Sequence, residues 1–149
     1  MQPRNNFCLN IDMKKKLEIG INKTTGELKK EFNREYPFLK IEFFREPCIK
    51  GTGFTKDKMI KRDEKLGNLQ REIKQGSFTF SDSTIVDEFE KSFFKKFGLC
   101  VQVFRKSGNV WLETSATDDW TLLQQNEEGE QLAQHFKVER ENPDDHDMY

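Results

Sequence analysis

The sequence has few of the features that identify membrane proteins and secreted proteins. No apolar run approaches the roughly 18–20 residues of a membrane span, and the N-terminus has no apolar stretch of the signal-peptide kind. The 3 cysteines, Cys8, Cys48 and Cys100, lie too far apart for a disulfide framework or a zinc knuckle. We therefore expect reduced thiols and a cytoplasmic protein that has no membrane partner.

Residues typical of catalytic and metal sites are also scarce. The 2 histidines, His135 and His146, lie near the C-terminus, and neither has a second ligand at helical spacing. The sequence contains no nucleophile elbow, phosphate-binding loop, dinucleotide-binding motif or zinc-protease motif. Adjacent carboxylates are common, but they suit helix caps. We predict a protein without enzymatic activity, cofactor or metal, while an enzyme that uses carboxylates alone stays open.

Charge is plentiful and nearly balanced, but it is unevenly distributed. The 149 residues include 25 Lys and Arg and 26 Asp and Glu, which gives a formal net charge of −1. Residues 1–106 hold 23 basic and 15 acidic residues, whereas residues 107–149 hold 2 basic and 11 acidic ones. This asymmetry indicates a basic face for an anionic partner and an acidic end that masks it. A solvated surface with an acidic tail explains the same counts.

Apolar residues make up only 34% of the chain, but aromatic side chains compensate for part of this deficit. There are 14 Phe, 2 Trp and 2 Tyr. Each buries a large apolar area, and disordered chains are usually poor in such residues. We therefore expect a small aromatic core.

Two parts of the chain resemble each other at a spacing of about 60 residues. At an offset of 61, apolar positions in residues 17–36 align with those in residues 78–97. At an offset of 60, residues 39–45 align with residues 99–105, with identical residues at three positions. We interpret this match as an internal duplication. The alternative is that two unrelated strand-helix-strand stretches share the same hydrophobic periods.

The duplication divides the chain into two repeats and a tail. The first α+β repeat covers residues 1–75 and includes an N-terminal hairpin, and the second covers residues 76–139. Residues 140–149 are rich in Asp and are predicted to be a disordered acidic tail. Residues 63–66 of the first repeat occupy nearly the same position in the repeat as residues 119–122 of the second.

Each repeat is predicted to run strand, helix, strand, strand. Alternating apolar residues predict a strand at residues 17–21, and apolar residues at every fourth position predict helices that contain Phe32 and Phe93. Second strands follow around residues 41–43 and 101–103. These elements place the protein in the α+β class.

The expected ends of the helices follow from local chemistry. Thr24 and Thr84 each precede an acidic residue three positions later, which is the capping-box pattern at the start of a helix. Pro37 denies a helical continuation, and Gly98 tolerates a left-handed cap.

The second repeat continues more clearly than the first. Residues 106–109 have turn composition, so the strands on either side are predicted to form an antiparallel hairpin. Beyond them, the Glu-rich residues 127–130 suggest a linker, and residues 135–138 suggest an edge strand.

This order of elements resembles the second half of a ubiquitin-like β-grasp. Pairing of residues 7–11 with residues 17–21 would add the N-terminal hairpin of that fold, and residues 78–80 would close the first sheet while opening the second. A ferredoxin-like arrangement uses similar pieces. The runs Val101–Glu113 and Asp119–Gln125 also resemble an uncharacterised family of small bacterial tandem-repeat proteins. That resemblance implies a bacterial or mobile-element origin and brings no catalytic residues with it.

A binding function is the first hypothesis. We predict a non-enzymatic protein-interaction module or adaptor, in which a sheet edge or groove meets a protein partner. Trp111, Trp120, Arg45 and Arg105 are the candidate anchors, because interface hot spots favour Trp and Arg. Core packing of both tryptophans is the alternative. Oligomeric state has no signal in the sequence.

Nucleic-acid binding is the second hypothesis. Basic residues recur on the two predicted helices and gather in the loop between residues 50 and 62, as expected of a phosphate-binding surface. Glutamates share the same helices, which is typical of a solvated face. The candidate basic patch consists of Lys29, Lys30, Lys95, Lys96, Lys56, Lys58, Lys61 and Arg62.

Overall fold

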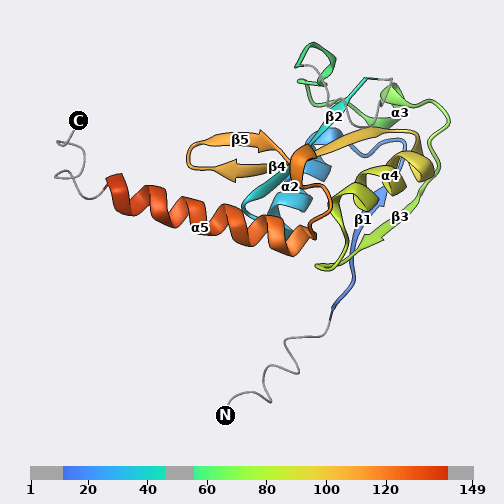
Figure 1. The fold of residues 1–149 in the computed structure, drawn as a ribbon. Coiled ribbons are helices and arrows are strands. Elements are labelled where there is room, and N and C mark those ends of the chain that lie inside the picture. Colours follow the sequence, from blue (N-terminus) through green and yellow to red (C-terminus); the bar gives the residue numbers. More distant parts are fainter. Residues whose placement is uncertain (1–11, 46–55, 141–149) are drawn as a thin grey trace.

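The computed structural model describes residues 12–45 and 56–140, and it confirms an α+β protein (Figure 1). The expected pairing of residues 7–11 and the acidic tail from residue 141 onward lie outside the described residues. The elements are β1 (Lys15–Ile19), α2 (Thr25–Glu35), β2 (Leu39–Phe44), η1 (Lys56–Lys58), α3 (Leu66–Leu69), β3 (Gly76–Phe80), α4 (Val86–Phe97), β4 (Cys100–Ser107), β5 (Val110–Glu113), η2 (Ser115–Thr117) and α5 (Leu122–Arg140).

The described strands form two antiparallel sheets. One contains β1 and β3, and the other has the order β2-β4-β5. Strand β3 pairs with β1 but takes no part in the β2-β4-β5 sheet, so residues 78–80 do not open a second sheet as expected, whereas the predicted β4–β5 hairpin is present. The strands of residues 12–45 pair with those of residues 76–107 instead of with each other. For this reason the described strands form neither a single β-grasp sheet nor the four-stranded sheet of a ferredoxin-like fold.

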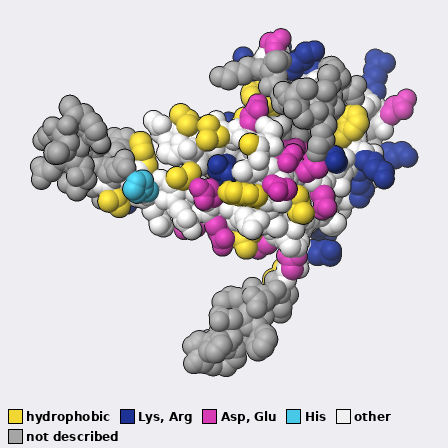
Figure 2. Space-filling model, viewed as in Figure 1, with side chains coloured by type: hydrophobic (Ala, Val, Ile, Leu, Met, Phe, Trp, Pro, Cys, Tyr) yellow, Lys and Arg dark blue, Asp and Glu magenta, His cyan; other side chains and the backbone are white. Residues whose placement is uncertain are grey.

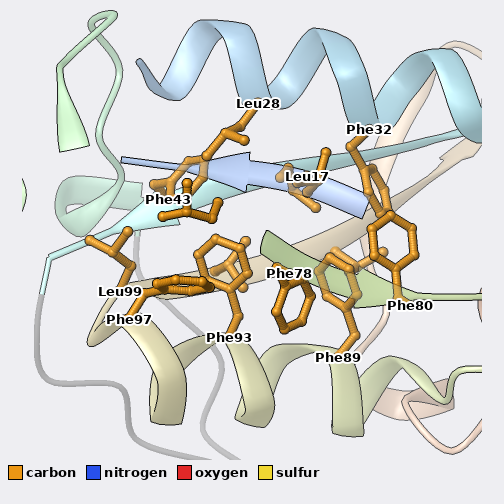
Figure 3. Packing of buried hydrophobic residues seen from close by; sticks show 14 of the residues in the cluster. Leu17, Leu28, Phe32, Phe43, Phe78, Phe80, Phe89, Phe93, Phe97 and Leu99 are labelled. Atoms are coloured by element: carbon orange, nitrogen blue, oxygen red, sulfur yellow. The ribbon is translucent and has the colours of Figure 1, made fainter. Parts of the chain in front are cut away.

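A single buried cluster holds the two sheets and two helices together. Figure 3 shows α2 and α4 on opposite sides of this cluster, with side chains from β1 and β3 between them. The ring of Phe89 on α4 lies 5.3 Å from that of Phe32 on α2 and 5.2 Å from that of Phe78 on β3, measured between centroids. Phe32 and Phe89 are fully buried. The predicted aromatic core is confirmed, and residues 1–75 and 76–139 both contribute to it.

The ends of the helices agree only in part with the sequence patterns. Thr24 and Glu27 form the complete capping box at the start of α2. The expected cap at Thr84 is wrong, because α4 begins one residue later and the Thr84 hydroxyl accepts a hydrogen bond from the Ser81 amide instead. Gly98 ends α4 in the left-handed conformation, with φ of 70°.

The loops that precede α2 and α4 make the same backbone hydrogen bonds to two later segments. The amide of Leu66 donates to the carbonyl of Lys23 over 2.8 Å, and the amide of Leu122 donates to the carbonyl of Thr84 over 2.9 Å. In the opposite direction, Thr25 donates to Glu64 over 2.8 Å and Val86 donates to Trp120 over 3.0 Å. Residues 63–66 and 119–122 therefore make corresponding contacts.

Helix α5 replaces the linker and the edge strand that were predicted for residues 127–138. It has 19 residues and lies over β4 and β2. Its contact with the sheet is close at Gly129, where an added Cβ would stand 2.8 Å from the Cβ of Phe38. The Glu-rich composition of residues 127–130 gives no sign of this contact with Phe38, so the sequence analysis did not predict the helix. The second half of α5 and the β4–β5 hairpin extend together from the rest of the molecule (Figure 1). We call residues 105–113 and 129–138 the arm.

One expectation about the cysteines is wrong. Cys100, at the start of β4, is disulfide-bonded and buried. Spacing along the chain cannot reveal this, because a disulfide depends on how closely the fold brings two sulfur atoms together.

Candidate interaction surface

Arg105 and Trp120 lie together at the junction between β4 and the start of α5. The guanidinium carbon of Arg105 lies 5.6 Å from the centre of the Trp120 ring, and its Nη1 donates to Oε1 of Gln125 over 2.7 Å. Gln125 is fully buried and donates onward to the carbonyl and hydroxyl of Thr117. Arg105 and Trp120 are both partly buried, and their contacts connect β4 to the segment that leads into α5.

Trp111 lies half-buried on β5 between two lysines. The Nζ atoms of Lys40 and Lys106 each lie 5.0 Å from the centre of its ring. Lys40 also pairs with the carboxylate of Glu42 over 3.0 Å. These cation–π contacts make Trp111 a part of the outer sheet surface and leave less of its ring available to a partner.

The two tryptophan clusters occupy opposite faces of the hairpin. Trp111 is opposite Lys106 in the strand register, and Arg105 is opposite Leu112. Successive residues of a strand point to opposite faces of a sheet. Trp111 and Arg105 therefore cannot belong to one continuous contact patch, which the linear sequence did not indicate.

Arg45 lies apart from the other three candidate anchors. It is exposed at the end of β2, and its amide donates to the carbonyl of Lys58 over 2.8 Å. It lines an open hollow of about 400 Å³ between α3, the end of α4 and the start of β4. Glu64 also lines the hollow, so the hollow carries charges of both signs.

The candidate basic patch is divided between distant parts of the fold. Lys29 and Lys30 lie on α2, whereas Lys95 and Lys96 lie on α4 at the other side of the core. Lys29 is paired with Glu42 over 2.9 Å, and the Nζ of Lys96 donates to the carbonyl of Ser77 over 2.9 Å. The two helices therefore do not present one basic face.

The basic residues that follow β2 form a smaller group. Lys58, Lys61 and Arg62 are exposed, and the last two line a second hollow with Arg45. The side chain of Lys56 lies outside the described part of the structure. Asp57 and Glu64 line the same hollow, which lowers its net positive charge.

A polar cluster joins β1, α2 and the loop after β3. The carboxylate of Asp82 accepts hydrogen bonds from Lys15 over 2.9 Å and from the hydroxyl of Tyr36 over 2.8 Å. Burial and the neighbouring Asp82 carboxylate raise the pKa of Tyr36 well above its ordinary value. Hydrogen bonds from Ser83 and Ser81 lower the pKa of Asp12. These partners satisfy one another, so the cluster has a structural role.

Strand β5 supplies the surface that the sequence analysis missed. Within the described residues it pairs only with β4, so its other edge is open. The side chains of Val110 and Leu112 are 52% and 42% exposed, and Val138 on α5 is 62% exposed. Figure 2 shows hydrophobic side chains on the surface of the arm. In the sequence, Val110–Glu113 is a short apolar run after a predicted turn, and only the sheet order shows that β5 lies at an edge.

The described part of the chain contains neither a cluster of metal ligands nor a membrane-spanning helix. Across residues 12–45 and 56–140, no three His, Cys, Asp or Glu side chains are placed to hold a metal ion. No helix in these two ranges combines the length and the apolar character needed to cross a membrane.

Comparison with known proteins gives no match. No protein-family profile, no curated protein and no solved structure is significantly similar to this chain. The resemblance to bacterial tandem-repeat proteins and the bacterial or mobile-element origin therefore stay predictions.

Proposed function

We propose that this protein is a duplicated α+β scaffold that binds another protein through the open edge of β5. The exposed edge strand, with two apolar side chains on one face, is the observation that carries the proposal. An unpaired strand edge offers a row of backbone donors and acceptors to an extended partner segment. Apolar side chains beside such an edge add specificity, because the partner must place its own apolar residues on the same face.

Corresponding contacts in the two halves support the duplication. The backbone hydrogen bonds of residues 23–25 with residues 64–66 recur between residues 84–86 and residues 120–122. Strand pairing adds a second argument. Leu17 lies opposite Phe78, and Glu42 lies opposite Gln102. Each of these pairs joins positions that the sequence offsets of 61 and 60 make equivalent, as a pseudo-twofold axis between two related repeats requires.

The arm fits a role in binding because it protrudes from the core that stabilises it. Arg105 and Gln125 anchor the base of the arm, where Leu112 lies opposite Arg105, and Val110 lies beside the turn at its tip. A hydrogen-bonded base gives the edge strand a fixed position before a partner arrives. This arrangement lowers the loss of conformational entropy that the binding contacts must offset.

Selection of extended peptides against the full chain tests this function. A random peptide library is displayed, binders are selected, and their contacts are mapped by amide chemical shifts. We expect the largest changes at the backbone amides of Trp111 and Glu113. Val110→Lys is expected to weaken peptide binding at least tenfold, because it places a charge in the apolar contact.

Ile21→Lys is the matched control, because Ile21 is 54% exposed and lies outside the arm. It is expected to leave peptide binding unchanged. An equal loss in both variants, or peptides that contact other strands, would contradict the proposal. Single-stranded and double-stranded DNA are titrated at low salt in parallel. Strong DNA binding that Val110→Lys leaves intact, without any peptide binding, would favour the basic residues instead.

A further inference from the structure

We propose that β5 pairs with β5 of a second copy of this chain, in an antiparallel register centred on Trp111. This inference rests on the proposed function of the β5 edge, and it names the partner. The argument depends on three properties of the arm, which are the direction of the backbone groups on β5, the side chains that self-pairing would bring together, and the space that α5 occupies.

The backbone of β5 presents suitable groups at Trp111. A two-residue turn at Gly108 and Asn109 joins β4 to β5, and Ser107 lies opposite Val110 at its base. Only Gly108 has a positive φ, of 65°, as in a type II′ turn, whose closing pair is hydrogen-bonded. Opposed residues then alternate between bonded and non-bonded pairs. The N–H and C=O of Trp111 therefore point away from β4.

The other strand agrees with this assignment. Lys106, which lies opposite Trp111, donates its amide to the carbonyl of Phe38 on the far side of β4. Lys106 and Trp111 thus form a non-hydrogen-bonded pair, and the backbone N–H and C=O groups of both point out of the hairpin. In an antiparallel pair of two β5 strands, Trp111 of one copy can form a hydrogen-bonded pair with Trp111 of the other. Asn109 of each copy can form a hydrogen-bonded pair with Glu113 of the other.

The same register brings compatible side chains together. With Trp111 at the twofold axis, Val110 of each copy lies opposite Leu112 of the other, on the face where α5 lies. Each copy thereby covers the apolar residues that the single chain leaves exposed. No two like charges are directly opposite, because Glu113 faces Asn109. A register centred on Leu112 would place Val110 opposite Thr114, which is already buried in its own chain.

Helix α5 leaves room for the second copy. It lies over β4 and β2, so in the extended sheet the two β4 strands, and the helices above them, are three strand spacings apart, or about 14 Å. Packed helices need about 8–10 Å. The two α5 helices therefore fit side by side, with Val110 and Leu112 of both copies in the space between them. A contact of five residues per copy is small, so we expect weak, concentration-dependent association.

Mixing two charged variants of the full chain tests the register. Sedimentation velocity is measured at increasing concentration for the natural chain, Val110→Lys, Leu112→Glu, and an equal mixture of the two variants. The natural chain is expected to dimerise at high micromolar concentration, and each variant alone at least tenfold more weakly. The mixture is expected to regain association within about threefold of the natural chain, because each Lys at 110 then faces a Glu at 112.

The controls separate this inference from the proposed function. Circular dichroism and unfolding midpoints check that both variants fold, and Ile21→Lys, which leaves the β5 edge intact, is expected to dimerise like the natural chain. A natural chain that stays monomeric throughout, or a mixture no stronger than its components, would overturn the self-pairing. If Val110→Lys nevertheless loses peptide binding, the edge still binds proteins and only the second copy is excluded.

Discussion

Truncation of Phe89 tests whether the two halves of the chain depend on one core. Phe89 lies on α4 and is fully buried. Its ring contacts Phe32 of the first half and two rings on β3, at centroid distances between 5.2 and 5.3 Å. Phe89→Ala therefore removes contacts that cross from residues 76–139 to residues 12–45. We expect both halves to lose stability together.

The magnitude follows from the size of the cavity and the number of rings. Replacement of a buried Phe by Ala costs about 3–5 kcal/mol, and the loss of aromatic pairs favours the upper part of that range. We expect the free energy of unfolding to fall by about 4 kcal/mol. This loss is a large part of the roughly 5–15 kcal/mol that stabilises a typical domain. Phe94→Ala on the same helix is the control, because Phe94 is 40% exposed, and we expect a loss below about 1 kcal/mol.

Urea unfolding and amide hydrogen exchange provide the assay. Unfolding curves give the change in free energy, and exchange reports where protection is lost. In Phe89→Ala we expect the amides of β1 and β2 to exchange faster than in the natural chain, and we expect the same of the amides of β3 and β4. Unchanged protection in β1 and β2 would show that the halves are stabilised separately. A loss of less than about 1.5 kcal/mol would show that Phe89 is not packed as described.

Two further predictions concern local interactions. Thr24→Ala is expected to lower the free energy of unfolding by about 1 kcal/mol in urea denaturation, whereas Thr84→Ala leaves the α4 cap unaffected. Because the pKa of Tyr36 is raised in the folded state, its neutral form is favoured there, and stability is lost above pH ~10, where the unfolded tyrosine ionises. Tyr36→Phe should therefore be less stable at pH 8, with a smaller deficit at pH 11; an equal deficit at both would refute this.

The sequence patterns predicted local elements well. The capping box at Thr24, the left-handed Gly98 and the turn after Ser107 depend on residues close together in the chain, and all three are present. The matched apolar stripes of α2 and α4 also predicted which aromatic residues are buried. The predictions failed where contacts between residues far apart in the sequence determine the secondary structure. Residues 135–138 form a helix instead of a strand because α5 packs on β4 and β2.

The candidate anchors show the same division. The sequence pointed to Trp111, Trp120 and Arg105 as candidate anchors. In the fold, Trp111 lies between two lysines, and Arg105 contacts Trp120 and Gln125. The fold also separates them onto two faces of one hairpin. The exposed edge at Val110 and Leu112 had no comparable signal, because an edge exists only in relation to the strands that are paired elsewhere in the sheet.

By itself, the sequence determined the α+β class, the positions of α2 and α4 and the presence of an aromatic core, because hydrophobic periods and caps are local properties. Tertiary structure alone decided that β2 pairs with β4, that both halves share one core, and that β5 lies at an edge of its sheet. The pairs β1–β3 and β2–β4 join residues about 60 positions apart, and a periodic pattern specifies which face of a strand is buried without specifying its neighbour.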